Sequence, residues 1–234
     1  MNSHPEGKNK TLTRRGFLKM SGAAAAGLGL SGILSDIIWL PDAIAALPVS
    51  EGYLLVDTKK CQGCLSCMLA CSLVHEGVEN LSLARIQVLQ NAFEKWPDDL
   101  AIEQCRQCVA PACVTACPTG ALHADAHFGQ VRTVTKAKCI GCGSCIRACP
   151  YRPAGMVWNP ALRQTRKCDL CADAPYHWDK AGGGPRGKQA CVDVCPVKAI
   201  AFTRVIPEQQ GDKGYKVNLR GAAWKKWKYP TEES

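Results

Sequence analysis

The chain has 234 residues and a net charge of +9, and its 16 cysteines far exceed the content of an ordinary globular domain. This length allows one or two compact domains. The even number of cysteines allows disulfides, zinc sites or iron–sulfur clusters, and the positive charge alone would allow a nucleic-acid partner. The sequence has no P-loop. In a dinucleotide-binding fingerprint, a glycine-rich run follows a strand and precedes a helix, and no glycine-rich run here has that position, so no nucleotide partner is expected.

Residues 1–45 have the three parts of an export signal: a basic region, an apolar run and an A-x-A site at Ala43–Ala45. Arg14 and Arg15 begin the stretch RRGFLKM, which resembles the twin-arginine signal that exports folded, cofactor-loaded proteins. We therefore expect export by the twin-arginine route, to the periplasm or the outer face of the cytoplasmic membrane. The alternatives are a membrane helix and an uncleaved, anchoring signal, but Asp36 inside the apolar run argues against a permanent anchor.

Beyond this signal, short strands and helical turns flank the cysteines. GYLLVD (Gly52–Asp57), GQVRTVT (Gly129–Thr135) and KAIAFTRV (Lys198–Val205) have the composition of strands. PTGALHAD after Cys117 and PVKAIAF after Cys195 each predict a helical turn followed by a strand. The sequence thus predicts an α+β fold with little regular secondary structure.

The cysteines form four groups of four, and each group ends with the spacing C-x₃-C. A proline follows the last cysteine of groups two, three and four, whereas Ser72 follows group one. Group four has nineteen residues between its second and third cysteines. This pattern is an internal repeat of one binding unit. In chain order the groups are Cys61, Cys64, Cys67 and Cys71; Cys105, Cys108, Cys113 and Cys117; Cys139, Cys142, Cys145 and Cys149; and Cys168, Cys171, Cys191 and Cys195.

The spacing C-x₂-C-x₂-C-x₃-C favours [4Fe–4S] clusters. The first three thiolates curl around one cubane, and the fourth, expected at the start of a helix, points to the other cluster of a pair. Small residues such as Gly63 and Gly141 would let backbone N–H groups approach the sulfurs. Structural zinc prefers two separated C-x₂-C knuckles, and disulfides would give no reason for this repeat, so both are weaker alternatives.

Four such clusters would also account for the positive charge. Residues 46–234 carry 24 Lys and Arg against 17 Asp and Glu, a net charge of +7. Sixteen thiolates and four oxidised cores contribute about −8, so the loaded chain is nearly neutral and no nucleic-acid partner is expected. Basic residues beside the cysteines would either raise cluster potentials or be solvated surface charges. These residues are Arg106, Arg147, Arg152 and Lys167.

The groups, in this order and with the long gap in group four, resemble the four-cluster iron–sulfur subunits of the molybdopterin oxidoreductases over about residues 53–205. This resemblance implies two nested bacterial-ferredoxin-like units with pseudo-twofold symmetry, each holding two [4Fe–4S] clusters. Groups one and four would form an outer unit from residues 46–98 and 158–206. Groups two and three would form an inserted unit from residues 99–157, and residues 207–234 would be a C-terminal tail.

The resemblance also implies which cysteines share a cluster, and we call the four expected ligands of one cluster a set. The family arrangement implies a linear order, with set one next to the catalytic subunit and set four next to the membrane partner. All sixteen positions are cysteine, so four [4Fe–4S] clusters are expected. Set one is Cys61, Cys64, Cys67 and Cys195; set two is Cys168, Cys171, Cys191 and Cys71; set three is Cys105, Cys108, Cys113 and Cys149; and set four is Cys139, Cys142, Cys145 and Cys117.

Nothing in the sequence indicates substrate chemistry, and the histidines after the signal form no ligand pair beside the cysteines. We expect an electron-transfer subunit without catalysis of its own. It would link a molybdopterin or tungstopterin catalytic subunit to a quinone-reactive membrane subunit. The alternatives are a free-standing polyferredoxin that serves several redox partners and a metal-stabilised structural module without redox function.

Three segments are expected to dock partners. Ser72–Gln104 and Ala172–Ala190 are longer than cluster binding requires. The tail has Trp224, Trp227 and Tyr229 among lysines, as is typical of an interface, although a frayed terminus is the alternative. No apolar span of about 20 residues follows the signal, so a membrane anchor would come from another subunit if the signal is removed.

Overall fold

The computed structural model describes residues 47–226. The expected signal in residues 1–45 and the end of the tail, with Trp227 and Tyr229, lie outside the described residues. Within residues 47–226, no helix has both the length and the apolar character needed to cross a membrane.

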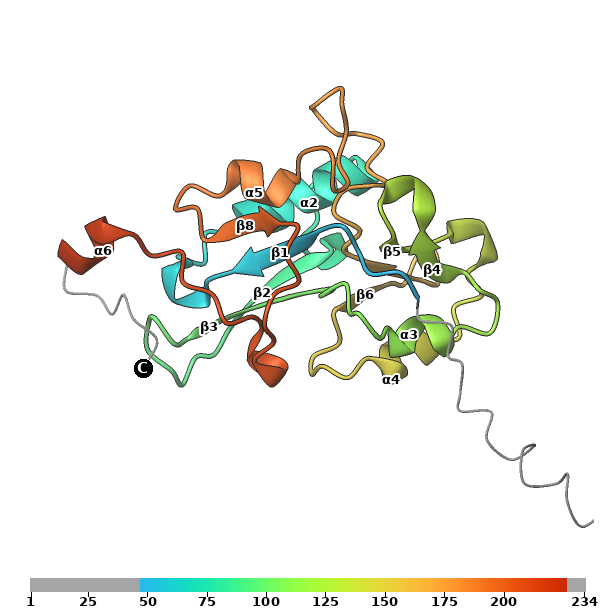
Figure 1. Ribbon diagram of the computed structural model, residues 1–234, viewed down its shortest axis with the longest axis horizontal. Helices are drawn as coiled ribbons and strands as arrows, with labels where there is room; N and C mark the ends of the chain where they lie inside the picture. Colours follow the sequence, from blue (N-terminus) through green and yellow to red (C-terminus); the bar gives the residue numbers. More distant parts are fainter. Residues whose placement is uncertain (1–46, 227–234) are drawn as a thin grey trace, which may run out of the picture. The chain divides into compact units, whose positions relative to one another are not determined.

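The strands form four separate two-stranded antiparallel sheets (Figure 1). β1 (Tyr53–Val56) pairs with β8 (Ile200–Thr203), so two segments from opposite ends of the described chain lie side by side. The other sheets are hairpins of strands that are adjacent in sequence. They join β2 (Ile86–Gln90) to β3 (Leu100–Gln104), β4 (Leu122–Asp125) to β5 (Val131–Val134), and β6 (Met156–Asn159) to β7 (Gln164–Lys167).

The α-helices are short and pack in two pairs. α2 (Ser66–Glu76) packs against α5 (Ala190–Val194), and α3 (Ala112–Thr115) packs against α4 (Ser144–Ala148). All four helices carry cysteines, so each pair brings together cysteines from two groups. The remaining helical segments are α6 (Ala222–Lys226) and the 3₁₀ turns η1 (Thr58–Lys60), η2 (Leu81–Leu83), η3 (Ala126–Phe128), η4 (Lys136–Lys138) and η5 (Gly211–Lys213).

One order of elements occurs twice in the described chain. β1, η1 and α2 follow one another around group one, and β5, η4 and α4 follow one another around group three. Likewise, a short helix followed by a strand occurs as α3 and β4 and as α5 and β8. The repeat seen in the cysteine spacing is therefore also a repeat of local structure.

The three strands expected from composition are confirmed as β1, β5 and β8, each inside its predicted range. The expectation that the fourth cysteine of a group begins a helix is wrong. Cys71 lies in the middle of α2, whereas Cys149 and Cys195 follow the last residues of α4 and α5. The helices begin next to the third cysteine instead. Each fourth cysteine is thereby carried about one helical turn away from the loop that holds the first two.

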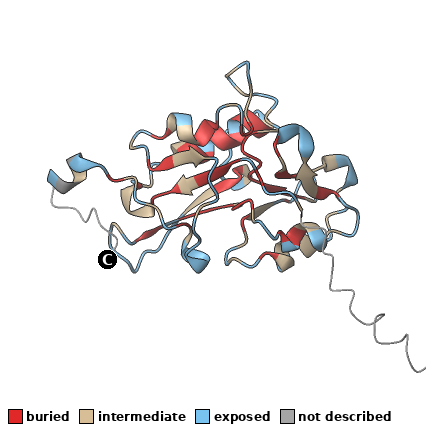
Figure 2. Cartoon of the chain, viewed as in Figure 1, coloured by how far each residue is buried: buried red, intermediate tan, exposed pale blue. Residues whose placement is uncertain are grey.

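The core lies between the β1–β8 sheet, α2 and the β2–β3 hairpin (Figure 2). Its apolar side chains include Leu54, Ile86 and Ile200, which are at most 3 % exposed. They pack around buried cysteines of groups one and four. The apolar core therefore surrounds the cysteines, so packing and ligand placement depend on the same residues.

The segment Ser72–Gln104, expected to dock a partner, forms part of this core. It folds into the β2–β3 hairpin, in which Ile86 and Ile102 are buried among the core residues. Its backbone also contacts the cysteines, because the Arg85 N–H donates to Cys71 Sγ at 3.2 Å. Its length therefore has a structural reason within the chain itself.

The described part of the tail folds back onto the chain. Asp57 Oδ2 accepts hydrogen bonds from the Leu219 N–H at 2.8 Å and from Arg220 Nε at 3.1 Å. The Tyr215 hydroxyl donates to the Arg106 carbonyl at 2.7 Å, and the rings of Trp224 and Trp96 are 6.1 Å apart. For residues 218–224, the alternative of a frayed terminus is therefore wrong.

Candidate cluster-binding sites

The four sulfurs of set one line one small cavity, together with Val88, Ile102 and Val197. Cys61 follows η1, Cys67 lies in the first turn of α2, and Cys195 follows α5. Burial raises the pKa of the Cys67 thiol to about 12, and the sulfurs of Cys61, Cys64 and Cys195 add to this rise. The sulfurs are thus close enough to interact, although Cys195 comes from the other end of the chain.

Set four has the corresponding arrangement around α3 and α4. Cys117, Cys139, Cys142 and Cys145 line a second small cavity, with Ala121, Leu122 and Val134 forming apolar walls. Burial is the main reason that the pKa of Cys145 is raised, and Cys117 and Cys139 contribute to the rise. Cys142 is exposed, and the other three are partly exposed.

Set three lies between Cys105 and Cys108, which precede α3, and Cys149, which follows α4. Burial raises the pKa of Cys113 to about 12, with additional contributions from Cys105, Cys108 and Cys149. The pKa of Cys108 is raised by burial and by Cys105 and Cys149. Cys113 therefore interacts with the other three sulfurs and Cys108 with at least two of them, across both groups.

Set two is the most deeply buried of the four, since all its cysteines are buried. Burial raises the pKa of Cys191 well above its ordinary value, and Cys171, Cys168 and Cys71 raise it further. Burial likewise raises the pKa of Cys168 to about 12. In each expected set, the structure thus places sulfurs from different cysteine groups within electrostatic range of one another.

Successive sets also lie near each other. Cys67 of set one contributes to the raised pKa of Cys191 in set two. Cys105 of set three contributes in the same way to the pKa of Cys168 in set two. Sets three and four meet through the packed helices α3 and α4, which hold Cys113 and Cys145. These neighbours link set one to set two, set two to set three, and set three to set four.

This donor chemistry fits a cluster of several irons. Buried, crowded thiols resist losing their protons, as the raised pKa values of Cys67, Cys113 and Cys168 indicate. A cationic metal core removes that cost, because it favours the thiolate form. In residues 47–226, no group of three or more His, Cys, Asp or Glu side chains surrounds the position of a single metal ion. The four thiolates of a cubane do not need to meet at a single metal ion, because each of them binds a different iron.

Backbone N–H groups point at sulfurs in each half of the repeat. Leu122 N donates to Cys117 Sγ at 3.4 Å, and Ala199 N donates to Cys195 Sγ at 3.2 Å. In both cases the donor lies at the strand that follows the cysteine. The Gly63 N–H donates to Cys61 Sγ at 3.4 Å, and its φ of +65° is in the left-handed region that favours glycine. Such bonds stabilise thiolates and adjust the properties of the metal that they bind.

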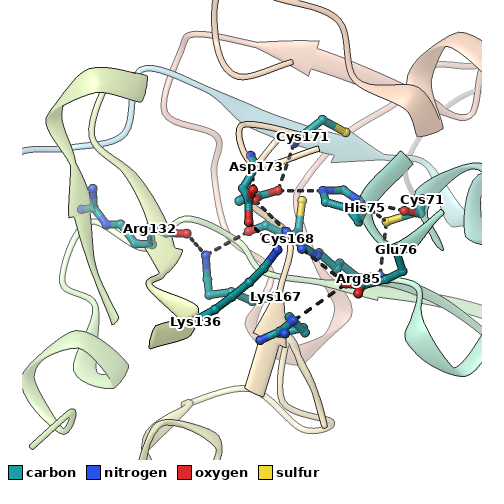
Figure 3. A network of polar contacts seen from close by, with 12 residues as sticks. Cys71, His75, Glu76, Arg85, Arg132, Lys136, Lys167, Cys168, Cys171 and Asp173 are labelled. Atoms are coloured by element: carbon teal, nitrogen blue, oxygen red, sulfur yellow. Dashed lines mark hydrogen bonds and ion pairs between the residues drawn. The ribbon is translucent and has the colours of Figure 1, made fainter. Parts of the chain in front are cut away.

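A buried ion network lies beside set two (Figure 3). Arg85 Nη1 donates to Asp169 Oδ2 at 2.6 Å, and His75 Nε2 lies 3.0 Å from Asp169 Oδ1. Burial raises the pKa of Asp169, but Arg85 and His75 more than offset this and hold it well below its usual range. Burial lowers the pKa of His75, but Asp169 reverses this and raises it to about 9. The three side chains are therefore charged and mutually dependent.

This network joins the two groups that supply set two. Asp169 stands between Cys168 and Cys171, and its Oδ1 accepts the Cys171 N–H at 3.1 Å. His75 is one helical turn from Cys71 on α2, with Nδ1 2.7 Å from the Cys71 carbonyl oxygen. The ion network thus holds α2 of group one against the loop of group four. The sequence pattern does not reveal this network, because Arg85 and Asp169 are 84 residues apart.

The basic residues beside the cysteines divide into two kinds. Lys167 and Arg106 are buried, and Lys167 Nζ donates to the Cys168 carbonyl at 2.9 Å. Arg147 and Arg152 are exposed. Arg132, which the sequence did not single out, is fully buried, and its Nη2 donates to the Cys108 carbonyl at 3.1 Å. Fixed positive charge therefore lies in the interior, close to sets two and three.

The glycine-rich loop between Cys171 and Cys191 closes over set two. A Cβ atom at Gly183 would lie 2.3 Å from the Cys171 carbonyl oxygen, so only glycine fits there without a shift. The Gly184 N–H donates to the Leu170 carbonyl at 2.6 Å. The segment Ala172–Ala190 was expected to dock a partner. At least its part around Gly183 instead covers the cysteines of set two in its own chain.

Two family models, each described as a 4Fe-4S dicluster domain, match residues 53–127 and 99–205. Together they cover all sixteen cysteines. Two dicluster domains hold four clusters, and sixteen cysteines are the number of ligands that four such clusters need. The chain therefore carries four [4Fe–4S] clusters as its cofactors.

Curated relatives agree with this assignment. The thiosulfate reductase electron transfer subunit PhsB of Salmonella typhi is 38% identical over 157 residues, which cover 65% of this chain and 75% of the relative. Protein NrfC of Escherichia coli K12 is 35% identical over 195 residues, covering 82% and 80%. The polyferredoxin-like subunit of the aliphatic sulfonate oxidoreductase of Pyrococcus furiosus is 37% identical over 147 residues, covering 61% and 70%. The chain belongs to the family of iron–sulfur electron-transfer subunits with 4Fe-4S dicluster domains.

Proposed function

We propose that this chain is an exported electron conduit between a molybdopterin or tungstopterin catalytic subunit and a quinone-reactive membrane partner. The observation that carries the proposal is the packing of the cysteine-bearing helices in two pairs, α2 with α5 and α3 with α4, with Cys67 in electrostatic range of Cys191 and Cys105 of Cys168. Centres held in such a row allow an electron to move by short one-electron steps. When bound, each [4Fe–4S] core supplies reversible one-electron chemistry.

The ligand assignment within the proposal is the one given by the four sets. The electrostatic contacts within each set and the repeated order of elements support two nested ferredoxin-like units with pseudo-twofold symmetry. Residues 46–98 with 158–206 form the outer unit in this proposal, and residues 99–157 form the inserted one.

Electrons enter and leave at sets one and four. Among the sixteen cysteines, all of which lie in residues 47–226, Cys64 and Cys142 are the two exposed ones. Cys64 belongs to set one and Cys142 to set four, the two ends of the row. The chain buries every cysteine of set two, whereas in set three Cys105 and Cys108 are partly exposed. Buried Lys167 and Arg132 raise the potentials there, because positive charge favours the reduced state.

Iron content and spectroscopy test this proposal. The protein purified without oxygen is expected to contain about sixteen irons and sixteen sulfides. Cys145→Ser is expected to change the signals of one cluster and leave those of set one unchanged, and Ile146→Val next to it serves as the control. Stoichiometric zinc in place of iron, or unchanged spectra at every cluster in Cys145→Ser, would contradict the proposal.

Partners and export need separate tests. The names of the relatives, one from a thiosulfate reductase and one from an aliphatic sulfonate oxidoreductase, support a place in a larger complex. Co-purification from native membranes is expected to yield a large subunit with molybdenum or tungsten; a chain without partners would favour a free-standing polyferredoxin. Replacing Arg14 and Arg15 by Lys is expected to keep the loaded protein in the cytoplasm, and normal export would refute the twin-arginine route.

A further inference from the structure

The basic residues of this chain are concentrated around set four. From Ala126 to Cys168 the sequence contains eight Lys and Arg and no Asp or Glu. Three of the eight, Arg132, Arg166 and Lys167, are buried. The other five are at least partly exposed, and they are Lys136, Lys138, Arg147, Arg152 and Arg163. The segment that supplies three of the four set-four cysteines therefore presents an entirely basic surface.

Three of these cations are exposed near Cys142. Lys138 precedes Cys139, and Arg147 Nη1 donates to the Cys142 carbonyl at 3.2 Å. Arg163 lies at the tip of the β6–β7 hairpin, and its carbonyl oxygen approaches Gly141. Among the described residues, none of the three forms an ion pair, whereas Lys136 pairs with Asp173 at 3.0 Å. Within residues 47–226, no carboxylate therefore neutralises these three cations.

Large apolar side chains are exposed on the same part of the chain. Ile140 is 68 % exposed, Leu162 is 54 % exposed and Trp158 is 38 % exposed. A Cβ atom at Gly141 would lie 3.2 Å from the Trp158 ring, so the hairpin that carries Trp158 and Leu162 rests on the loop that carries Ile140. An apolar contact area ringed by charges of one sign is the usual composition of a specific electrostatically guided interface.

The surface near set one has a different charge. A groove of about 680 Å³ lies there, since it is lined by Leu100, which also contacts Gly63. Its lining contains both acidic and basic residues, among them Glu94, Asp98 and Lys59. The charge near set four is therefore uniform, whereas the charge of this groove is mixed.

We propose that the surface formed by Ile140, Trp158 and Leu162 with Lys138, Arg147 and Arg163 docks an acidic protein that exchanges electrons with the set-four cluster. This inference rests on the proposed electron-transfer function and adds the chemistry of the partner. Opposite charges guide the two proteins into contact, and the apolar side chains then bring the partner's redox centre close to Cys142.

A protein fits this surface better than a lipid surface does. An anionic membrane would also attract the three cations. Its lipid headgroups, however, contain no redox centre that could exchange electrons with a cluster near the exposed Cys142. The apolar side chains are also few and sit beside the cysteine loop, as in a contact with a shaped partner. Membrane binding is therefore the outcome that the test must separate from protein docking.

The test compares two double variants of the full, cluster-loaded protein. Lys138→Glu with Arg163→Glu reverses two exposed charges beside set four. Lys95→Glu with Arg204→Glu reverses two exposed charges outside this surface, neither of which forms an ion pair among the described residues, and is the matched control. The reduced proteins are mixed with an acidic flavodoxin, a basic cytochrome c or a small uncharged quinone, and the rate of electron transfer is followed at several salt concentrations.

With flavodoxin, the unchanged protein is expected to react fastest at low salt, and the set-four variant about tenfold more slowly. The control variant should stay within about twofold of the unchanged protein, and the uncharged quinone should react equally with all three. A salt-independent rate, or equal slowing in both variants, would overturn the docking inference. A different result would identify a membrane as the partner. In that case vesicles of equal parts phosphatidylglycerol and phosphatidylcholine bind the unchanged protein but not the set-four variant, while both proteins react with flavodoxin at the same rate.

Failure of the proposed function would look different. A protein that lacks iron, or whose clusters cannot be reduced, would give no electron transfer to the quinone either. A protein that reduces the quinone but shows no preference between flavodoxin and cytochrome c keeps the proposed function and loses only the docking inference.

Discussion

The cysteines of set two are all buried, whereas those of set four are all at least partly exposed, with Cys142 open to solvent. Set two is also surrounded by charges inside the fold, the Arg85–Asp169–His75 network, while the cations near set four point outward. In the interior each charge needs a partner of its own, because no water screens it. At the surface, water and salt screen the charges, so the cations near set four are available to bind a partner protein.

Removing a ligand tests this difference most strongly. Cys191→Ser places a polar hydroxyl in the buried set two, where metal binding and folding are coupled, so little folded protein is expected to accumulate. Cys142→Ser changes an exposed position at the end of the row, and this variant is expected to fold and keep about twelve irons. Iron analysis and the yield of soluble protein after anaerobic purification measure both effects. Equal yields from the two variants would contradict the contrast.

The ion network gives the next largest effect. Asp169→Ala would leave Arg85 and His75 buried without a counter-charge, which is expected to cost about 3–5 kcal/mol of stability. Asp173→Ala is the control from the same loop, because Asp173 pairs with Lys136 at the surface, and less than about 1 kcal/mol is expected there. The guanidinium concentration at which cluster absorbance is lost reports the difference. Similar midpoints for the two variants would mean that the buried network does not hold set two.

The close contact of the glycine loop gives a smaller effect. Gly183→Ala would force the loop away from Cys171, with an expected loss of about 1–3 kcal/mol. A Cβ at Gly221 meets nothing within 4 Å, so Gly221→Ala is expected to change stability by less than about 0.5 kcal/mol. The same absorbance assay measures both variants. An unchanged Gly183→Ala midpoint would show that closure over set two is dispensable.

The sequence predicted the parts of the molecule that depend on local spacing. The cysteine groups and the strands β1, β5 and β8 follow from patterns within about ten residues. The hairpins β2–β3 and β6–β7 did not, because their strands lack a clear alternation of apolar and polar residues. For example, the last three residues of β7, Thr165, Arg166 and Lys167, are all buried although they are polar, and Lys167 is 2 % exposed.

The polar residues around the cysteines could not be found from spacing. Arg85 and Asp169 meet only when α2 and the group-four loop come together, and Asp57 meets Arg220 across 163 residues. His75 looked like an ordinary surface histidine, although it is 3 % exposed. The position of Asp169 inside CDLC was the one available signal, since a carboxylate between two cysteines is costly unless a cation compensates it.

The pairing of β1 with β8 also constrains how the protein is made. Cys61, Cys64 and Cys67 leave the ribosome early, but Cys195 and the strand that closes β1 arrive only near the end of synthesis. Sets three and four lie wholly within residues 105–149 and have all their cysteines much sooner. Because contacts between distant segments form late, cofactor insertion is expected to proceed from the inserted half outward. The nascent chain would then carry its first three set-one thiols unprotected until translation is nearly complete.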